Sequence, residues 1–181
     1  MKVFQPTPQD LVLDLGGGDG RYFASLYPWP ERIVILDINF KGLQRLSQSI
    51  PVCGNGTELP FKDEVFDIVW SNAVIEHVGG FEVQRRFAAE IRRVGRGYFV
   101  TTPWKGFPIE LHYKLPFYQF VPKRIQQWIS KYVALGWYER REWEDINLLW
   151  QHELQKLFPD ARVIKQRVTL WPETLIAYRM R

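Results

Sequence analysis

A run of aliphatic residues that ends in consecutive glycines, LVLDLGGGDG at residues 11–20, constrains the fold more than any other feature. Leucine and valine side chains in succession suit a strand buried on both faces, as in a parallel sheet. The glycines at 16–18 favour tight or left-handed geometry, so the strand must end there. Because the following RYFASLY can start a helix from about Arg21, the stretch predicts a strand, a glycine turn and a helix. Such a turn presents backbone N–H groups at the carboxyl edge of a sheet, where a nucleotide-like ligand can approach.

The residues in and beside this turn narrow the class of ligand. A dinucleotide-binding loop, G-x-G-x-x-G, needs a third glycine at position 21, where this chain has Arg21. Asp14 lies at the end of the strand and Asp19 lies within the loop. Carboxylates there would repel a pyrophosphate and attract a cation. They favour S-adenosylmethionine (SAM), whose methionine end carries an ammonium and a sulfonium, while a glycine-rich turn with no ligand is the alternative.

Strands and helices alternate along most of the chain. The predicted strands are RIVILDIN (32–39), IPVCGNG (50–56), the start of VFDIVWSNAVIEHV (65–78) and GYFVTTP (97–103). The helices predicted between them are FKGLQRLSQ (40–48) and FEVQRRFAAEIRRV (81–94). Near the carboxyl terminus, ARVIKQRVTL (161–170) and ETLIAYRM (173–180) predict a hairpin at the edge of the sheet. This alternation predicts an α/β fold with a mainly parallel, doubly wound sheet.

Asp37 ends the second predicted strand, 37 − 20 = 17 residues after Gly20. A carboxylate at that place can accept hydrogen bonds from both hydroxyls of a ribose. The alternative is that Asp37 caps the helix that follows.

Residues 103–150 break the alternation and hold five of the eight tryptophans. Within them, KRIQQWISKYVAL (123–135) has apolar residues at spacings of three and four, with lysine and arginine opposite. We expect a helical insert in which this segment is a lid whose apolar face packs on the sheet. The alternatives are a binding surface for a hydrophobic or planar acceptor and a helix that lies on an anionic membrane surface.

Length and composition limit the number of domains, the possible partners and the cellular compartment. The chain has 181 residues, enough for one α/β domain, and we expect residues 1–181 to form a single domain. Its net charge of +4 permits contact with RNA or a membrane without requiring either, and the basic residues are scattered rather than clustered. Cys53 is the single cysteine, which suits a reducing compartment. Residues 1–10 do not read as a signal peptide, so we expect a cytoplasmic protein and leave its oligomeric state open.

With these residues in view, the chain resembles the class I SAM-dependent methyltransferases, in particular the methyltransferase type 11 group. LVLDLGGGDG is similar to the first motif of the family, and LDIN is similar to its ribose-binding strand end. LPFKDEVFDIVWSNAVIEHV (59–78) is similar to the family's stretch around the fourth strand and is the most specific of the three. The resemblance implies a Rossmann-like, seven-stranded sheet in a three-layer sandwich, with one late antiparallel strand. It also implies SAM as the cofactor.

The resemblance carries a cofactor site onto this sequence, position by position. The implied site consists of Asp14, Gly16, Gly17, Gly18, Asp37, Ile38, Asn55, Gly56, Ser71 and Asn72. The loop residues would hold the methionine moiety and Asp37 the ribose diol. Asn55 stands where the family usually has an aspartate that accepts from the adenine amino group. No metal site is expected.

Methyl transfer asks little of the protein, because the sulfonium is already a strong electrophile. The protein must align the acceptor and, for weak nucleophiles, remove a proton. His112, in PIELHYKLPF just after the fifth strand, is the candidate general base, and a hydrogen-bonded anchor is its alternative role. Glu76 and His77 are expected to cap or pack the turn after the fourth strand.

The sequence therefore predicts a SAM-dependent methyltransferase that acts on a small organic or lipid-like acceptor. A non-catalytic SAM-binding or partner-binding domain is the first alternative, because only ten residues precede Leu11 where family members usually have helices that cover the cofactor. An NAD-dependent oxidoreductase is a weaker alternative, disfavoured by Asp14 and Arg21. With so short a lead-in, the pocket is more open, or the insert covers it, or another subunit does.

Overall fold

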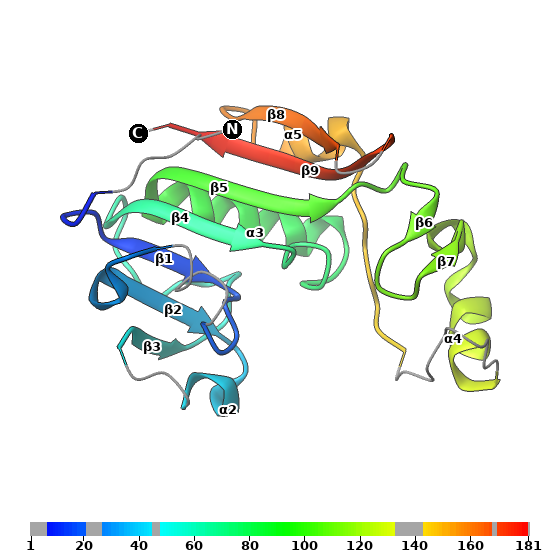
Figure 1. The fold of residues 1–181 in the computed structure, drawn as a ribbon, viewed down its shortest axis with the longest axis horizontal. Helices are drawn as coiled ribbons and strands as arrows, with labels where there is room; N and C mark the ends of the chain where they lie inside the picture. Colours follow the sequence, from blue (N-terminus) through cyan, green and yellow to red (C-terminus); the bar gives the residue numbers. More distant parts are fainter. Residues whose placement is uncertain (1–6, 21–26, 45–47, 133–142, 168–169, 181) are drawn as a thin grey trace.

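A computed structural model of the chain describes residues 7–20, 27–44, 48–132, 143–167 and 170–180. These residues build a seven-stranded sheet in the order β3-β2-β1-β4-β5-β9-β8 (Figure 1). The strands are β1 (Val12–Leu15), β2 (Ile33–Asp37), β3 (Ile50–Cys53), β4 (Phe66–Asn72), β5 (Gly95–Pro103), β8 (Arg162–Arg167) and β9 (Pro172–Arg179). β1 to β5 pair in parallel, and β9 runs antiparallel to both of its neighbours, β5 and β8. The predicted sheet, with its late antiparallel strand in a carboxyl-terminal hairpin, is confirmed.

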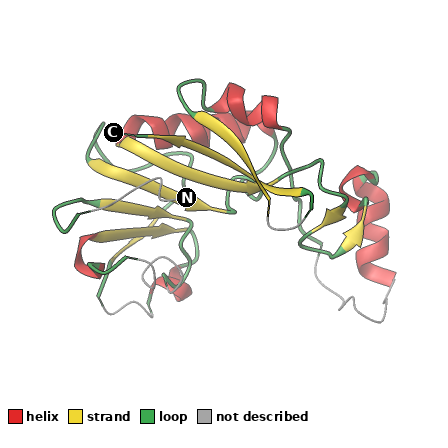
Figure 2. Cartoon of the chain, turned by 45° about the horizontal axis from the view of Figure 1, so that its top comes forward, coloured by secondary structure: helices red, strands yellow, loops and turns green. Residues whose placement is uncertain are grey.

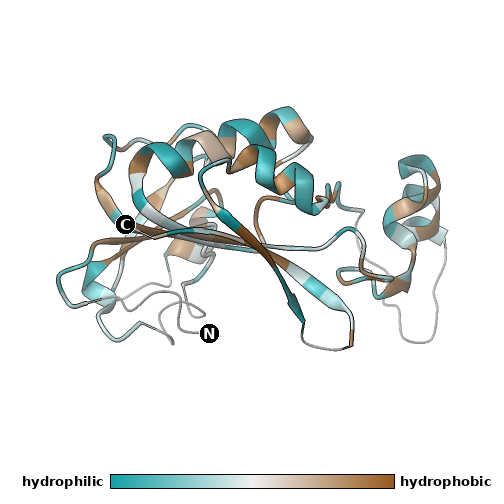
Figure 3. Ribbon diagram, turned by 90° about the horizontal axis from the view of Figure 1, so that it is seen from above, coloured by the Kyte–Doolittle hydropathy of each residue, from teal (hydrophilic) through white to brown (hydrophobic). Residues whose placement is uncertain are grey.

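The sheet buries side chains on both faces, which explains the continuous aliphatic runs of its central strands. On one face, α3 (Phe81–Val94) and α5 (Gln151–Leu157) lie side by side (Figure 3). Phe87 and Ile91 of α3 are buried in this layer, together with Phe158 just after α5.

The opposite face holds a second cluster that includes Val12, Ile33, Ile35 and Tyr27. The helix predicted from about Arg21 falls on residues 21–26, which lie outside the described residues. The short elements η1 (Pro30–Arg32) and α2 (Phe40–Leu43) flank β2 in the chain.

The cap of α2 settles one of the alternatives left open by the sequence. Asn39 is the N-cap residue, and its side chain accepts a hydrogen bond from the Gly42 N–H at 3.3 Å. Asp37 lies two residues earlier and does not cap the helix. Its carboxylate is therefore directed elsewhere.

The insert forms a separate lobe beyond the carboxyl end of β5 (Figure 2). Its elements are β6 (Ile109–Glu110), β7 (Leu115–Pro116), η2 (Tyr118–Phe120) and α4 (Lys123–Tyr132). β6 and β7 pair in an antiparallel hairpin, and the chain returns to the sheet through a bridge between Trp104 and Leu149.

The helix α4 is not the expected lid. Trp128 and Tyr132 are each 57% exposed, and Ser130 is the buried residue of this helix. The Tyr118 hydroxyl donates to the Gln126 carbonyl at 2.9 Å, and Ile129 packs on the small cluster around Tyr118. The expectation of a hidden apolar face is wrong for these residues, because α4 is packed on its own lobe rather than on the sheet. In the described part of the chain, no helix is long and apolar enough to cross a membrane.

Candidate active site

The glycine loop follows β1 in the chain and is hydrogen-bonded to the carboxyl end of β2. Gly16 has φ +80°, and a Cβ there would stand 2.5 Å from Val74 Cγ2, so only glycine fits without strain. Its N–H donates to the Leu36 carbonyl at 2.8 Å. Gly18 has φ +58° and open space where its Cβ would be. The loop thus leaves room above its backbone, as a bound cofactor requires.

Asp37 fixes this loop from the end of β2. Its Oδ2 accepts a hydrogen bond from the Gly18 N–H at 2.9 Å, and its Oδ1 accepts from the Asn39 N–H at 2.7 Å. Each carboxylate oxygen can accept more than one hydrogen bond, so the group keeps capacity for a ligand. Two backbone donors therefore orient the carboxylate before any ligand arrives.

A cavity of about 400 Å³ opens beside this loop, and we call it the glycine-loop cavity. Its lining is Leu15, Gly16, Leu36, Asp37, Ile38, Gly54, Asn55, Gly56, Ala73, Val74, His77, Val78 and Phe87. The lining includes five of the predicted cofactor residues, namely Gly16, Asp37, Ile38, Asn55 and Gly56. It includes no described residue of the insert, so the described part of the insert does not cover this cavity.

Asp14 lies beneath the loop rather than in the lining. Its carboxylate is tucked against Gly17, where a Cβ would stand 2.3 Å from Asp14 Oδ2. Burial, with a smaller contribution from the charge of Asp37, raises the pKa of Asp14 to about 7. The group is thus poised to change charge near neutral pH.

Of three further predicted residues, two are engaged in local hydrogen bonds and one is not. Asn72 Oδ1 accepts from the Thr101 hydroxyl at 2.7 Å, and the buried Ser71 hydroxyl has no hydrogen-bond partner among the described residues. Asn55 Oδ1 accepts from both the N–H and the hydroxyl of Thr57, at 3.0 and 2.9 Å. An adenine amino group that donated to Asn55 Oδ1 would therefore compete with these two hydrogen bonds from Thr57.

The insert forms a second cavity of about 240 Å³ with α3 and α5, and we call it the insert cavity. Its lining is Phe81, Gln84, Lys105, Glu110, Tyr113, Tyr118, Gln119, Val121, Lys123, Gln126, Ile146, Asn147, Leu148, Leu149 and Glu153. Gln84 of α3 ties its walls together, since its amide donates to the carbonyls of Ile75 at 3.1 Å and Asn147 at 2.8 Å. The lining is rich in polar and charged side chains.

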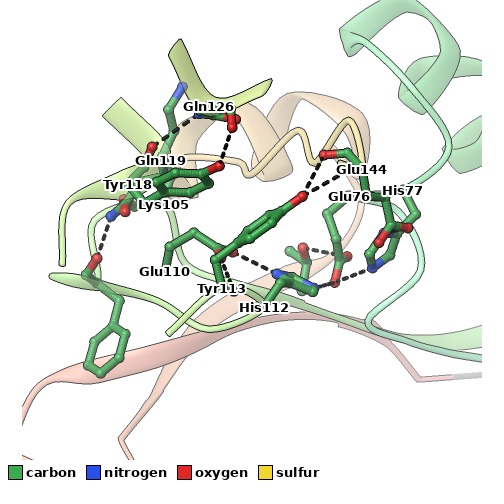
Figure 4. Close-up of polar contacts among 12 residues, drawn as sticks. Glu76, His77, Lys105, Glu110, His112, Tyr113, Tyr118, Gln119, Gln126 and Glu144 are labelled. Carbon is green, nitrogen blue, oxygen red and sulfur yellow. Dashed lines mark hydrogen bonds and ion pairs between the residues drawn. The ribbon is translucent and has the colours of Figure 1, made fainter. Parts of the chain in front are cut away.

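Glu76, His77 and His112 lie close together (Figure 4). Both imidazole Nε2 atoms are 3.9 Å from Glu76 Oε1, and the two rings meet edge to face at 5.0 Å. His77 lines the glycine-loop cavity, while the partner of His112, Glu110, lines the insert cavity. The three side chains, which we call the His–Glu cluster, therefore link a lining residue of one cavity with a lining residue of the other.

Outer carboxylates hold both rings of the His–Glu cluster. His112 Nδ1 lies 2.6 Å from Glu110 Oε1, and because an ionised carboxylate only accepts, this nitrogen carries the proton. His77 Nδ1 lies 2.8 Å from Glu144 Oε1, at ion-pair distance but without the alignment of a hydrogen bond. Tyr113 binds both glutamates. Its N–H donates to the Glu110 carboxylate at Oε2, at 2.7 Å, and its hydroxyl accepts from the backbone N–H of Glu144 at 2.8 Å.

Burial and charge set the protonation of the cluster. Burial raises the pKa of Glu76, whose side chain is fully buried, although the Thr102 hydroxyl donates to its Oε2 at 2.8 Å. Burial lowers the pKa of His112, but the hydrogen bond to Glu110 and the charges of Glu110, Glu76 and Glu144 outweigh it. The pKa of His112 therefore lies above its ordinary value.

Sequence reasoning did not bring Glu76, His77 and Glu144 together with His112. The pair Glu76–His77 was expected to cap or pack the turn after β4, and β5, whose connection carries His112, is the parallel neighbour of β4. Parallel strands end at one edge of a sheet, so this meeting could have been predicted from the sequence. Glu144 has no local motif, and only tertiary structure brings it here.

The chain is similar to known proteins in both sequence and structure. Residues 13–100 match the sequence profile of a methyltransferase domain family. An uncharacterised protein of Methanocaldococcus jannaschii is 34% identical over 95 residues, which are 52% of this chain and 40% of that protein. The biotin biosynthesis bifunctional protein BioHC of Cellvibrio japonicus is 26% identical over 130 residues, which are 69% of this chain and 24% of that protein. The chain thus spans less than half the length of either relative.

Among solved structures, a SAM-dependent methyltransferase from Methanosarcina mazei is similar with a TM-score of 0.65 and 15% identity. The similarity covers 97% of this chain and 94% of that one, which shows a shared fold. The resemblance seen in the sequence is confirmed: residues 13–100 match the methyltransferase domain family, and the chain has the fold of a class I SAM-dependent methyltransferase.

Proposed function

We propose that this protein is a SAM-dependent methyltransferase that methylates a small polar acceptor, and that residues 1–181 act as a single domain. One observation carries the proposal, namely that the His–Glu cluster links His77, in the lining of the glycine-loop cavity, with Glu110, in the lining of the insert cavity. Transfer between two bound molecules needs two adjoining sites with a group that can handle a proton between them.

The glycine-loop cavity fits SAM through its own residues. Positive φ at Gly16 and Gly18 lets the backbone approach a ligand, and the Asp37 carboxylate is oriented at the strand end, where it can accept hydrogen bonds from the hydroxyls of a ribose. Asp14, once ionised, provides a negative charge near the cationic methionine end. Bound SAM would supply the electrophilic methyl group.

The insert cavity supports a polar acceptor more than a lipid-like one. Lys105, Gln119 and Asn147 are among its lining residues, and Gln119 Oε1 is buried with no hydrogen-bond partner among the described residues. A buried polar atom of this kind is stabilised by a ligand that donates to it. A small organic molecule with hydroxyl or amine groups meets that need, whereas an acyl chain does not.

His112 is the proposed general base. Because its Nδ1 donates to Glu110, the lone pair of the neutral ring is on Nε2. That atom lies 3.9 Å from Glu76 Oε1 and belongs to the same cluster as His77, which lines the glycine-loop cavity. His112 can therefore take a proton from an acceptor aligned with the methyl group.

The proposal is tested by separating binding from transfer. Calorimetry with SAM, S-adenosylhomocysteine and NAD tests the cofactor, and release of S-adenosylhomocysteine is then measured with a panel of small hydroxylated and aminated compounds and, in a second arm, with lipids. We expect His112→Ala to lower transfer far more than it lowers SAM affinity. Binding of NAD instead of SAM contradicts the proposal, and SAM binding without transfer in either arm favours a non-catalytic SAM-binding domain.

A further inference from the structure

We propose that the His–Glu cluster is a binding site for a divalent transition-metal ion such as Zn²⁺, with Glu76 Oε1, His77 Nε2 and His112 Nε2 as ligands. These three atoms lie within 4.8 Å of one another. Two imidazole nitrogens and one carboxylate oxygen form a ligand set that suits zinc, iron, cobalt or manganese rather than calcium or magnesium.

The buried carboxylate of Glu76 supplies the second observation. Its side chain is 0% exposed, its Oε2 is satisfied by Thr102, and its Oε1 has no hydrogen-bond partner among the described residues. An unsatisfied buried oxygen is costly, and each one in a native structure needs an explanation. Both imidazoles stand 3.9 Å away, too far for a hydrogen bond, so the protein groups alone leave Oε1 unsatisfied.

The spacing fits an ion between the three atoms. Ligand atoms of a tetrahedral zinc site are about 3.4 Å apart, given metal–ligand bonds of about 2.1 Å. The two separations of 3.9 Å from Glu76 Oε1 therefore need to contract by only about half an ångström, and the two histidine nitrogens, which lie within 4.8 Å of each other, need to approach by at most about 1.4 Å. The His77 and His112 side chains are 28% and 21% exposed, which leaves them room for this adjustment.

The carboxylates that surround the His–Glu cluster are also arranged as they are around metal-binding histidines. Histidines that bind metals usually give their other ring nitrogen to a carboxylate, which fixes the tautomer and raises the basicity of the ligating nitrogen. Here Glu110 holds His112 Nδ1 and Glu144 stands beside His77 Nδ1. A network of hydrogen bonds alone would not require both Nε2 atoms to converge on one carboxylate oxygen.

An ion at this place would be bound by His77, which lines the glycine-loop cavity, and could polarise an acceptor hydroxyl, with His112 then a ligand rather than the general base. That extension rests on the proposed function. Metal binding itself does not, because it can be measured without SAM and without an acceptor.

The test uses the full chain without an affinity tag, stripped of metal by a chelator and dialysed. Zn²⁺ is titrated by calorimetry, and Co²⁺ is added to record the visible absorption of a tetrahedral site. We expect one ion per chain. Glu110→Gln and Glu144→Gln should each weaken binding by about 10–100-fold, and His77→Gln and His112→Gln should weaken it more.

His152→Gln is the matched control, because His152 is exposed on α5 and belongs to no part of the cluster. It should bind Zn²⁺ as the parent does. Glu76→Gln is a further ligand variant, interpreted only if circular dichroism shows a parent-like fold, and the two histidine variants keep the test independent of it.

Binding that His77→Gln and His112→Gln leave unchanged overturns the metal site, as does the absence of saturable binding. The parent and each variant are also titrated with SAM. A histidine variant that loses metal binding but keeps its SAM affinity supports the metal site independently of the proposed function. A parent that binds Zn²⁺ but not SAM contradicts the proposed function and leaves the metal site supported.

Discussion

The sheet and the insert are stabilised in different ways. In the sheet, aliphatic and aromatic side chains are buried in a cluster that extends over five of its strands and two helices, and parallel pairing joins residues far apart in the chain. In the insert, the buried apolar cluster consists of Tyr113, Leu115 and Tyr118. Much of the remaining cohesion is polar, as in the Gln119 amide that donates to the carbonyls of Lys105 and Phe107.

This difference suits the sheet and the insert to different roles. The loop and the Asp37 carboxylate, which need fixed positions, stand on the strand ends of a large core. The insert has few buried apolar contacts and is therefore less stable, so its lining can change without loss of the fold. Cofactor binding should accordingly be tied to the sheet, and acceptor choice should be tied to the insert.

The largest expected effect concerns stability. Phe158→Ala removes a fully buried ring that packs on Tyr98, and we expect it to lower the free energy of unfolding by about 3–5 kcal/mol. Trp128→Ala, at an exposed aromatic residue of α4, should change it by no more than about 0.5 kcal/mol. Urea unfolding of both variants measures the contrast, and equal losses would mean that the insert belongs to the main core.

Cofactor affinity gives the next largest effect. Asp37→Ala removes a charged hydrogen-bond acceptor worth about 1.5–3 kcal/mol, so SAM affinity should fall by roughly 10–150-fold. Calorimetry of a folded variant measures it. Glu82→Ala, which removes an exposed carboxylate from α3, is the control and should bind as the parent does. An unchanged SAM affinity in Asp37→Ala would show that Asp37 does not bind the ribose of SAM.

The parts of the fold that could be predicted from the sequence are those with strong local patterns. The aliphatic runs of β1, β2 and β4 admit few structures other than buried parallel strands, and the glycine loop must follow the first of them. The hairpin of β8 and β9 was visible in its two alternating segments. The position of Asp37 was predictable too, because the end of a strand is fixed once the strand is known.

Other features depend on packing that no local pattern encodes. The spacing of apolar residues in α4 predicts an amphipathic helix but not the surface on which it packs, so the lid was wrongly expected. The N-cap of α2 is Asn39, two residues beyond the alternative that was considered. Glu144 reaches the His–Glu cluster through tertiary contacts of its segment: the Tyr113 hydroxyl accepts from the Glu144 N–H across 31 residues of chain, and the Asn147 N–H donates to the Glu76 carbonyl at 2.8 Å.

The third prediction uses the charge of Asp14. Because its pKa is about 7, the carboxyl is mostly neutral at pH 6 and mostly ionised at pH 7.5, and only the ionised form attracts the ammonium of SAM. SAM affinity should therefore rise by roughly five-fold over that range, before the amino group of SAM loses its proton at a pKa of about 7.7–8.0. Asp14→Asn should flatten the profile measured by calorimetry.

The same group links pH to stability. Its folded-state pKa lies above the ordinary value of 3.8, so the folded chain holds a proton that the unfolded chain releases. The contribution of Asp14 to stability is therefore fully present below pH 4 and declines as the pH rises through about 7. Asp14→Asn should remove that decline in urea unfolding, and a variant with the parent's pH dependence would show that another group titrates.

The smallest expected effect is confined to the insert. Tyr118→Phe keeps the ring but removes the hydroxyl that donates to the Gln126 carbonyl at 2.9 Å and lies 3.3 Å from Ser130 Oγ. The Gln126 carbonyl still accepts a helical hydrogen bond, so the loss should be near the lower end for a neutral bond, about 0.5 kcal/mol. Amide hydrogen exchange in α4 should then quicken by roughly two-fold, while amides of β4 exchange as before. SAM affinity should also stay the same, because no described insert residue lines the glycine-loop cavity. Faster exchange in β4, or weaker SAM binding, would show that the two regions unfold together and that the division of tasks between them is wrong.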